Sequence, residues 1–279
     1  MPTATIRGAE INYTVLGERG PWVALSPGGR RAYSGVMPIA SGLANAGYRV
    51  LLHDRRNCGA SEVTIDANEP EGRMWGEDLH ALLAHVGAAP AIIGGASSGS
   101  RLALTLAIDH PEDVRGLLLW RVTGGRFAAN RLAEAYHDEF TAAARSGGMA
   151  AVCATEHFAG LIEARPANRD KLMAMDPAQF VDAMTRWRAF YSAAVDQPVL
   201  GADAAELRAI KTPACIIPGN DRTHWKQAGF DLAKLMPNAE VHDLFPQVVD
   251  VDAVGPEGWA PKEGEIIALF DRFIRTRCL

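Results

Sequence analysis

Apolar residues in the first 120 positions follow two alternating patterns. Short apolar runs predict strands, and longer segments with apolar residues at helical spacing predict helices. In the segment MWGEDLHALLAHVG, for example, Leu79, Leu82, Leu83 and Val86 share one helical face, and Gly87 is a stop signal. The predicted strands cover 10–17, 21–26, 48–54, 89–95 and 114–120, and the predicted helices cover 35–47, 74–87 and the segment from Ser97 to Pro111. This alternation favours a mostly parallel sheet with helices on both faces.

The alternation breaks between about residues 127 and 205, where the pattern is helical throughout. Strand patterns resume at 212–219 and 239–245, and an amphipathic helix is predicted over 263–277. We therefore expect three parts: a first core segment at 1–126, a helical insertion at 127–205 and a second core segment at 206–279. Within the insertion, Phe180, Met184, Trp187 and Tyr191 recur at the spacing of a helix-packing stripe.

Composition narrows the class of protein. The 279 residues are 48% hydrophobic and 22% charged, which is ordinary for a globular chain long enough to bury a large core. A net charge of −5 argues against nucleic acid or an anionic membrane as a partner. The first residues lack the apolar centre of a signal peptide, and four widely spaced cysteines form no metal-binding pair. We expect a cytoplasmic protein with free thiols and no metal, while its oligomeric state stays open.

The segment IIGGASSGSRLAL carries the strongest chemical signal. Gly95-Ala96-Ser97-Ser98-Gly99 fits G-x-S-x-G, a motif in which a strand turns sharply into a helix and exposes a serine hydroxyl. An ordinary turn serine is the alternative interpretation. A serine hydroxyl is a weak nucleophile and needs a base to take its proton.

Three further segments accompany this motif in the order and at the intervals of a known family: HDRRNCGAS, HPEDVRGLLL and TPACIIPGND. Together with GGASSGS they make nearly the whole chain resemble an α/β-hydrolase with a helical cap. The resemblance implies an α/β-hydrolase fold with the cap at 127–205, Ser97 as nucleophile, a small-molecule substrate and no cofactor. It also implies an oxyanion hole formed by the backbone N–H groups of Gly29 and Ser98, although Pro27 stands where the family has histidine.

The resemblance places the catalytic acid at Asp221, which could instead cap the next helix. The family's histidine is missing, because the loop PQVVDVDAVGPEGWAPKEG contains none. His224 is the remaining histidine on a loop at the expected edge of the sheet, and we take it as the candidate base. Since it follows Asp221 by three residues, one arrangement has Asp250 or Asp252 orienting its ring from the neighbouring loop. The competing arrangement keeps Asp221 as the acid and draws a histidine from the cap, such as His137 or His157.

Residues near the expected pocket suggest what it binds. Arg30, Arg121 and Trp187 are candidate substrate contacts, which suit a partly apolar substrate with anionic or carbonyl groups. Arg55 and Arg56 match the family's structural loop, and Cys58 in the same loop is expected to be a buried, inert thiol.

The favoured function is hydrolysis of an ester or a similar activated carbonyl compound. A lyase, isomerase or cyclase on the same fold is the first alternative, because the fold alone does not select the reaction. A ligand-binding protein without catalysis is the second alternative. Labelling by a fluorophosphonate probe would separate the hydrolase from both.

Overall fold

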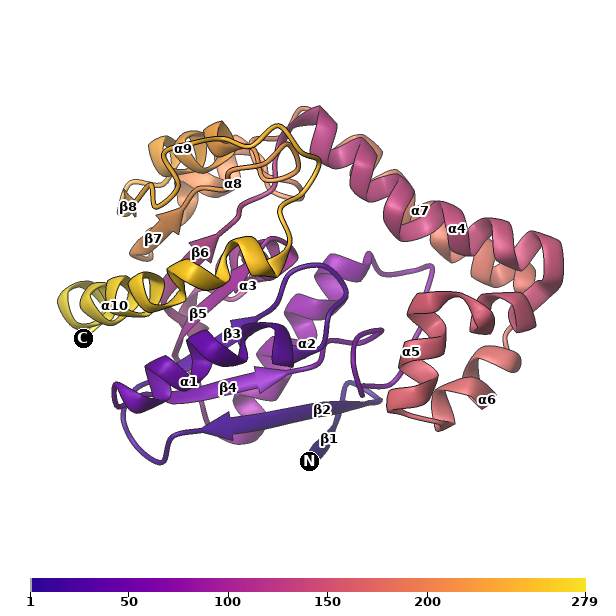
Figure 1. Cartoon of the computed structure of the whole chain (residues 1–279). Coiled ribbons are helices and arrows are strands. Elements are labelled where there is room, and N and C mark those ends of the chain that lie inside the picture. Colours follow the sequence, from indigo (N-terminus) through magenta and orange to yellow (C-terminus); the bar gives the residue numbers. More distant parts are fainter. Residues whose placement is uncertain (1) are drawn as a thin grey trace.

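The computed structural model describes residues 2–279 and is built on an eight-stranded sheet in the order β1-β2-β4-β3-β5-β6-β7-β8 (Figure 1). Strands β1 and β2 form an antiparallel pair, β2 is antiparallel to β4, and the pairs from β4 to β8 are parallel. The strands are β1 (Thr3–Ile6), β2 (Ala9–Leu16), β3 (Trp22–Ser26), β4 (Arg49–His53), β5 (Ala91–Ala96), β6 (Val114–Trp120), β7 (Ala214–Ile217) and β8 (Ala239–Val241).

Helices cover both faces of this sheet, and the helices of the insertion extend away from it (Figure 1). The α-helices are α1 (Met37–Asn45), α2 (Glu71–Val86), α3 (Ser98–Asp109), α4 (Gly125–Ala154), α5 (Glu156–Ala164), α6 (Ala167–Met173), α7 (Pro177–Ala193), α8 (Ala204–Ala209), α9 (Lys226–Leu235) and α10 (Glu263–Phe273). Short 3₁₀ turns cover Tyr33–Val36, Pro111–Asp113, Pro256–Gly258 and Ala260–Lys262, and a π-helical turn follows α10 at Ile274–Cys278.

Alternate residues of the central strands point into two hydrophobic cores, one on each face of the sheet. In β3, Val23 and Leu25 point toward α1 and α10, whereas Ala24 points toward the opposite face. That opposite face is covered by α2, α3, α8 and α9, through side chains such as Leu79 and Leu232. Because both faces of the sheet are buried, its central strands are continuous apolar runs.

Helices α4 to α7 pack around a separate hydrophobic core, to which Val63 and Met74 also contribute. Phe140, Phe158, Phe180 and Trp187 belong to this core, so the aromatic stripe of the insertion mainly holds helix against helix. Helix α4 is kinked where Gly147 and Gly148 leave helical geometry, the latter at φ 63°. In Figure 1 the long helices α4 and α7 run side by side and extend beyond the sheet.

The local predictions differ from the structure at several element ends. β1 was missed because its four residues are too short for a clear alternation. β8 ends at Val241, so His242 lies just beyond the strand in which it was predicted. As predicted, Gly87 ends α2, in the left-handed conformation at φ 65°. All four cysteines are buried free thiols, and no helix within residues 2–279 is both long and apolar enough to cross a membrane.

Candidate active site

Ser97 lies on the turn between β5 and α3 at φ 54° and ψ −111°, a conformation that non-glycine residues rarely adopt. The glycines beside it are required by packing. A Cβ atom on Gly99 would lie 2.2 Å from the carbonyl oxygen of Ser26, and one on Gly95 would lie 2.5 Å from the backbone of Gly99. The motif therefore brings the end of β3 directly against the turn that presents the serine.

His224 is in contact with Ser97. Its Nε2 atom lies 3.0 Å from the Ser97 hydroxyl oxygen, and its Nδ1 atom lies 2.9 Å from both carboxylate oxygens of Asp221. Asp221 is fully buried, while Ser97 and His224 keep 8% and 5% of their surface exposed. The three side chains thus form a continuous serine, histidine and carboxylate relay with a small opening at the serine.

A single tight loop after β7 carries both the acid and the histidine. One oxygen of Asp221 accepts a hydrogen bond from the backbone N–H of His224, 2.7 Å away, and this turns the histidine ring back over the carboxylate. Gly219 makes the turn possible, because a Cβ atom there would lie 2.2 Å from the His224 carbonyl oxygen. The three-residue spacing is therefore compatible with the relay.

The neighbouring loop supports this arrangement through its backbone. The N–H of Val254 donates to Asp221 at 2.9 Å, and the carbonyl groups of Val251 and Asp252 accept bonds from the backbone of Arg222 and Thr223. The suggested exchange, in which Asp250 or Asp252 orients His224, is wrong. Within residues 2–279 neither carboxylate bonds the ring, because Asp221 already occupies its Nδ1 atom; Asp252 instead pairs with Arg222 at 3.0 Å.

The arrangement with a cap histidine is also wrong. His137 is fully buried within the helical insertion, where its Nδ1 atom lies 3.0 Å from the Ala133 carbonyl oxygen. Burial, together with the charge of Arg30, lowers the pKa of both His137 and His157 to about 3. Among the described residues, His224 is the histidine that reaches Ser97.

Burial and charge keep His224 poised as a base. Burial lowers its pKa below the ordinary value, Arg121 and Arg131 add to this effect, and the hydrogen bond that the ring donates to Asp221 opposes it. Burial by itself would raise the pKa of Asp221, but its hydrogen bonds with His224 and Val254 outweigh burial and lower the pKa. At neutral pH the ring is therefore neutral and the carboxyl group is ionised.

Arg121 is predicted to contact substrate, and its side chain also contacts Asp221 and His224. It follows β6 in the left-handed conformation, at φ 57°. One guanidinium nitrogen lies 3.5 Å from Asp221 and 3.4 Å from the His224 Nδ1 atom, and it donates to the carbonyl oxygen of Val254. Arg121 therefore connects the end of β6 to both loops of the relay, while still lining the cavity beside Ser97.

Gly29 and Ser98, the predicted oxyanion-hole residues, lie on facing segments of the backbone. Ser98 is the first residue of α3, where N–H groups have no partner within the helix. The Ser98 hydroxyl donates to the Gly29 carbonyl oxygen at 2.8 Å. Arg55 bonds both residues, at 2.9 Å to the Ser98 hydroxyl and 2.6 Å to the Gly29 carbonyl. The sequence did not identify Arg55 as the support of this pair.

Two predicted substrate contacts do not reach the cavity. Arg30 turns away from Ser97 into a buried ion pair with Glu71 at 2.9 Å. Trp187 is buried in the helical insertion, and its indole N–H lies 3.0 Å from the carbonyl oxygen of Asp66 and 2.9 Å from that of Glu69. Both predictions are wrong for the same reason: each side chain finds its partners in the contact between the insertion and the core.

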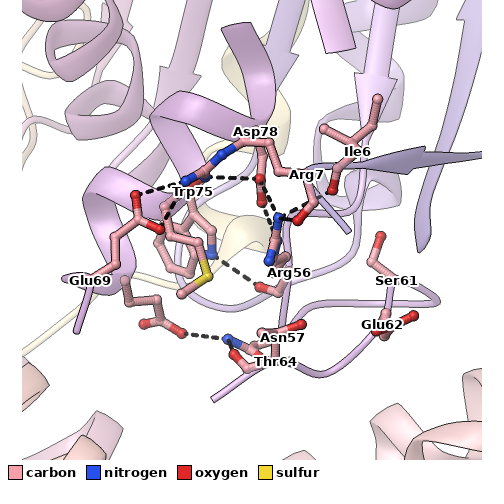
Figure 2. A network of polar contacts seen from close by, with 12 residues as sticks. Ile6, Arg7, Arg56, Asn57, Ser61, Glu62, Thr64, Glu69, Trp75 and Asp78 are labelled. Carbon is pink, nitrogen blue, oxygen red and sulfur yellow. Dashed lines mark hydrogen bonds and ion pairs between the residues drawn. The ribbon is translucent and has the colours of Figure 1, made fainter. Parts of the chain in front are cut away.

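The loop after β4 is fixed by a buried polar network (Figure 2). Arg56 donates to both oxygens of Asp78, at 2.7 and 2.8 Å, and to the backbone carbonyl groups of Ile6 and Arg7. The indole of Trp75 donates to the Arg56 carbonyl oxygen at 3.0 Å. These contacts agree with the structural role expected of this loop. Burial raises the pKa of the nearby Cys58 thiol to about 12, so it is protonated and unreactive.

A cavity of about 310 Å³ opens over Ser97, at the carboxyl ends of the parallel strands. Its wall combines apolar side chains with three arginines. The lining residues from the core are Pro27, Gly28, Gly29, Arg31, Gly35, Val36, Ile39, Ala96, Ser97, Trp120, Arg121, Thr223, His224, Ala253, Val254, Gly255, Pro256, Trp259, Glu263 and Ile266, and those from α4 are Arg131, Leu132 and Tyr136.

One group of side chains has the spacing of metal ligands, and it lies away from this cavity. Cys215, Glu240 and His242 place ligand atoms within 4.8 Å of one another on and beside β7 and β8. Glu240 is paired with His242 at 2.9 Å and with Arg277 at 3.4 Å, while burial raises the pKa of the Cys215 thiol. The carboxylate is thus already neutralised and the thiol protonated, which disfavours a cation there.

Comparisons with known proteins agree with this architecture. A family model for the alpha/beta hydrolase fold matches residues 26–137, which include Gly29, Ser97 and Ser98. The uncharacterized hydrolase YraK of Bacillus subtilis (strain 168) is 37% identical over 119 residues, a match that spans 42% of each chain. The 2-hydroxymuconate semialdehyde hydrolase of Pseudomonas putida is 28% identical over 245 residues, covering 84% of this chain and 82% of that one.

The structural comparison covers the whole chain. The enol-lactonase from Burkholderia xenovorans LB400 superposes with a TM-score of 0.63 at 22% identity, over 97% of this chain and 98% of that one. The chain has the α/β-hydrolase fold. The predicted fold class is confirmed.

The packing of the elbow glycines leads to a first prediction. Gly99→Ala should destabilise the protein by about 1–3 kcal/mol or more, because its methyl group would overlap the Ser26 carbonyl. Gly160→Ala, in the open middle of α5, is the matched control and should be neutral or stabilise by up to about 1 kcal/mol. Urea denaturation measures both variants. Equal stability of the two would contradict the packing argument.

A second prediction concerns the charges around His224. Its pKa, followed by NMR across pH 4–8, should lie below 6.5 in the native protein. Arg121→Gln should raise this pKa, because a nearby positive charge is removed, and Asp221→Asn should lower it further, because the partner of the protonated ring is lost. A spectrum of His224→Gln assigns the signal among the eight histidines. Shifts of the same sign in the two charge variants would exclude this account.

Proposed function

We propose that this protein is a serine hydrolase that cleaves esters or similarly activated carbonyl compounds. The observation that carries the proposal is the 3.0 Å contact between the Ser97 hydroxyl oxygen and the His224 Nε2 atom, with Asp221 on the other ring nitrogen. In this proposal His224 takes the proton of Ser97 as its oxygen attacks the substrate carbonyl carbon. The proton then passes to the leaving-group oxygen, and water activated by His224 releases the acyl group from Ser97.

The negative charge that develops on the carbonyl oxygen requires donors that are already in place. We assign this role to the backbone N–H groups of Ser98 and Gly29. Arg55 supports the assignment, because its guanidinium donates hydrogen bonds to the Gly29 carbonyl oxygen and to the Ser98 hydroxyl. A carbonyl group is a poor partner for an oxyanion, so its engagement by Arg55 helps keep it turned away from the substrate.

The helical insertion is proposed to act as a cap that selects substrates. Arg131, Leu132 and Tyr136 of α4 line the cavity over Ser97, so this helix contributes to the binding surface. We propose the boundaries 127–205 for the cap. Its remaining helices contact the cavity through α4 rather than directly.

The rival functions predict different outcomes. The histidine missing from the second loop favours a lyase, isomerase or cyclase. The 3.0 Å distance between the His224 Nε2 atom and the Ser97 hydroxyl oxygen argues for the hydrolase instead. Two of the named relatives are a semialdehyde hydrolase and an enol-lactonase, and hydrolysis of a lactone fits the same proposed chemistry of attack on a carbonyl. A binding protein would retain ligand affinity but leave Ser97 unreactive.

Loss of the nucleophile gives the most direct test. Ser97→Ala should abolish labelling by a fluorophosphonate probe and lower kcat on a p-nitrophenyl ester by about four to six orders of magnitude. Ser192→Ala, on the exposed side of α7, is the control and should keep both properties. Labelling of the native protein that persists in Ser97→Ala would overturn the assignment, and a folded native protein that is never labelled would favour the rival functions.

The pH dependence of the reaction provides a further prediction. Neutral His224 is the active form, and its pKa lies below 6.5. The value of kcat/KM should therefore keep more than half of its plateau as pH falls from 8 to 6.5, and decline by about tenfold per pH unit once pH is well below the pKa of the ring. Initial rates with a p-nitrophenyl ester measure this profile. Loss of half the activity above pH 6.5 would contradict a base with a lowered pKa.

A further inference from the structure

The wall of the cavity over Ser97 is positively charged, although the whole chain carries a net charge of −5. Arg31, Arg121 and Arg131 line it, and Glu263 is the single acidic residue among the lining side chains that the structure describes. Charge of one sign gathered in a partly enclosed cavity attracts ligands of the opposite sign. An arginine can bind such an anionic ligand only if its guanidinium N–H groups are not already paired within the protein.

The three arginines differ in how their charge is used. Arg121 is engaged by Asp221 and by the carbonyl oxygen of Val254, so it contributes to the local field rather than to ligand contact. Arg31 is exposed, and within residues 2–279 its guanidinium has no hydrogen-bonding or ion-pair partner. Arg131 on α4 has 36% of its side chain exposed, and its contact with Asp252 is 3.9 Å long. Arg31 and Arg131 therefore have donors available.

These two arginines line the cavity from different parts of the chain. Arg31 comes from the core, two residues after Gly29, and its side chain lies beside Gly35, where an added Cβ atom would be 3.9 Å from the Arg31 Cδ atom. Arg131 comes from the cap helix, and its charge is close enough to His224 to lower the pKa of that ring. A ligand in the cavity can thus contact both Ser97 and guanidinium groups that have donors available.

The rest of the wall limits the body of the ligand. Val36, Ile39, Leu132, Trp259 and Ile266 make much of it apolar. A volume of about 310 Å³ is at the lower end of the range for small-molecule sites, roughly 300–1,000 Å³. A short carbon chain fills such a space better than a highly charged polyphosphate, and a terminal carboxylate matches the planar donor arrangement of arginine.

We propose that Arg31 and Arg131 form a carboxylate-binding subsite, and that the substrate is a short-chain ester or lactone carrying a carboxylate on its acyl portion. This inference rests on the proposed hydrolase function, which supplies the ester or lactone. It assigns the two arginines to binding and orientation of the substrate, and it leaves proton transfer to His224.

Two esters of matched length test the subsite. One is the mono-p-nitrophenyl ester of glutaric acid, which carries a carboxylate, and the other is p-nitrophenyl valerate, which is neutral. In the native protein the ratio of kcat/KM for the anionic ester to that for the neutral ester should exceed one. Each of Arg31→Gln and Arg131→Gln should lower this ratio by about 10- to 100-fold, the scale for one hydrogen bond to a charged group.

Arg145→Gln is the matched control, because this arginine lies on the same helix α4 and is exposed away from the cavity. It should leave the ratio unchanged. General damage to the site would lower both rates together and keep the ratio, so a constant ratio in Arg31→Gln and Arg131→Gln would overturn the subsite. A native ratio of one or less would overturn it as well.

Binding without catalysis separates this inference from the hydrolase proposal. Trp120 and Trp259 line the cavity, so tryptophan fluorescence can report on its occupancy. Glutarate should bind Ser97→Ala, neutral glutaramide should bind less well, and adding Arg131→Gln should remove the difference. If neither ester is hydrolysed while this difference is present, the hydrolase proposal fails and the anion site stands. Equal affinity for glutarate and glutaramide overturns the anion site itself.

Discussion

The contact between the carbonyl oxygen of Ser26 and the backbone of Gly99 is the constraint on which the rest of the site depends. It leaves no space for a side chain at Gly99, and Gly95 is enclosed in the same way. The end of β3 can therefore lie directly against the elbow. This approach places Gly29 opposite Ser98 and fixes Ser97 in a conformation that a looser turn would relax.

The arginine side chains have two separate uses in this molecule. Arg30, Arg55 and Arg56 are paired or bonded to backbone, and they join loops and the insertion to the core. Such paired charges contribute geometry more than stability, because desolvation offsets much of their attraction. Arg31 and Arg131 lack strong partners and face the cavity. Sequence position does not separate the two kinds, since Arg30 and Arg31 are neighbours whose side chains point to different environments.

The fold could be predicted from the sequence because its signals are local. Alternating strands and helices, the glycine spacing around Ser97 and the stop at Gly87 each act over a few residues, and the structure agrees with them. The partner of His224 could not be predicted in this way. It depends on a turn closed by a hydrogen bond from a backbone N–H to Asp221 and on the close approach at Gly219, neither of which has a pattern in the sequence. Trp187 failed as a prediction because burial against Asp66 is a tertiary contact.

Asp221 and His224 lie on one loop, so the loop that follows β8 supplies neither the acid nor the histidine and its side chains can vary. Its contacts with the Asp221 carboxylate and with the backbone of Arg222 and Thr223 come from main-chain groups: the N–H of Val254 and the carbonyl oxygens of Val251 and Asp252. Main-chain groups are the same for nearly every residue type, so the side chains of this segment are released from the chemistry. Ala253, Val254 and Pro256 from this segment nevertheless line the cavity. The side chains that contact Ser97 and those that shape this side of the cavity thus lie on different loops. Substitutions along the loop after β8 can change which substrates fit while Ser97, His224 and Asp221 stay in place.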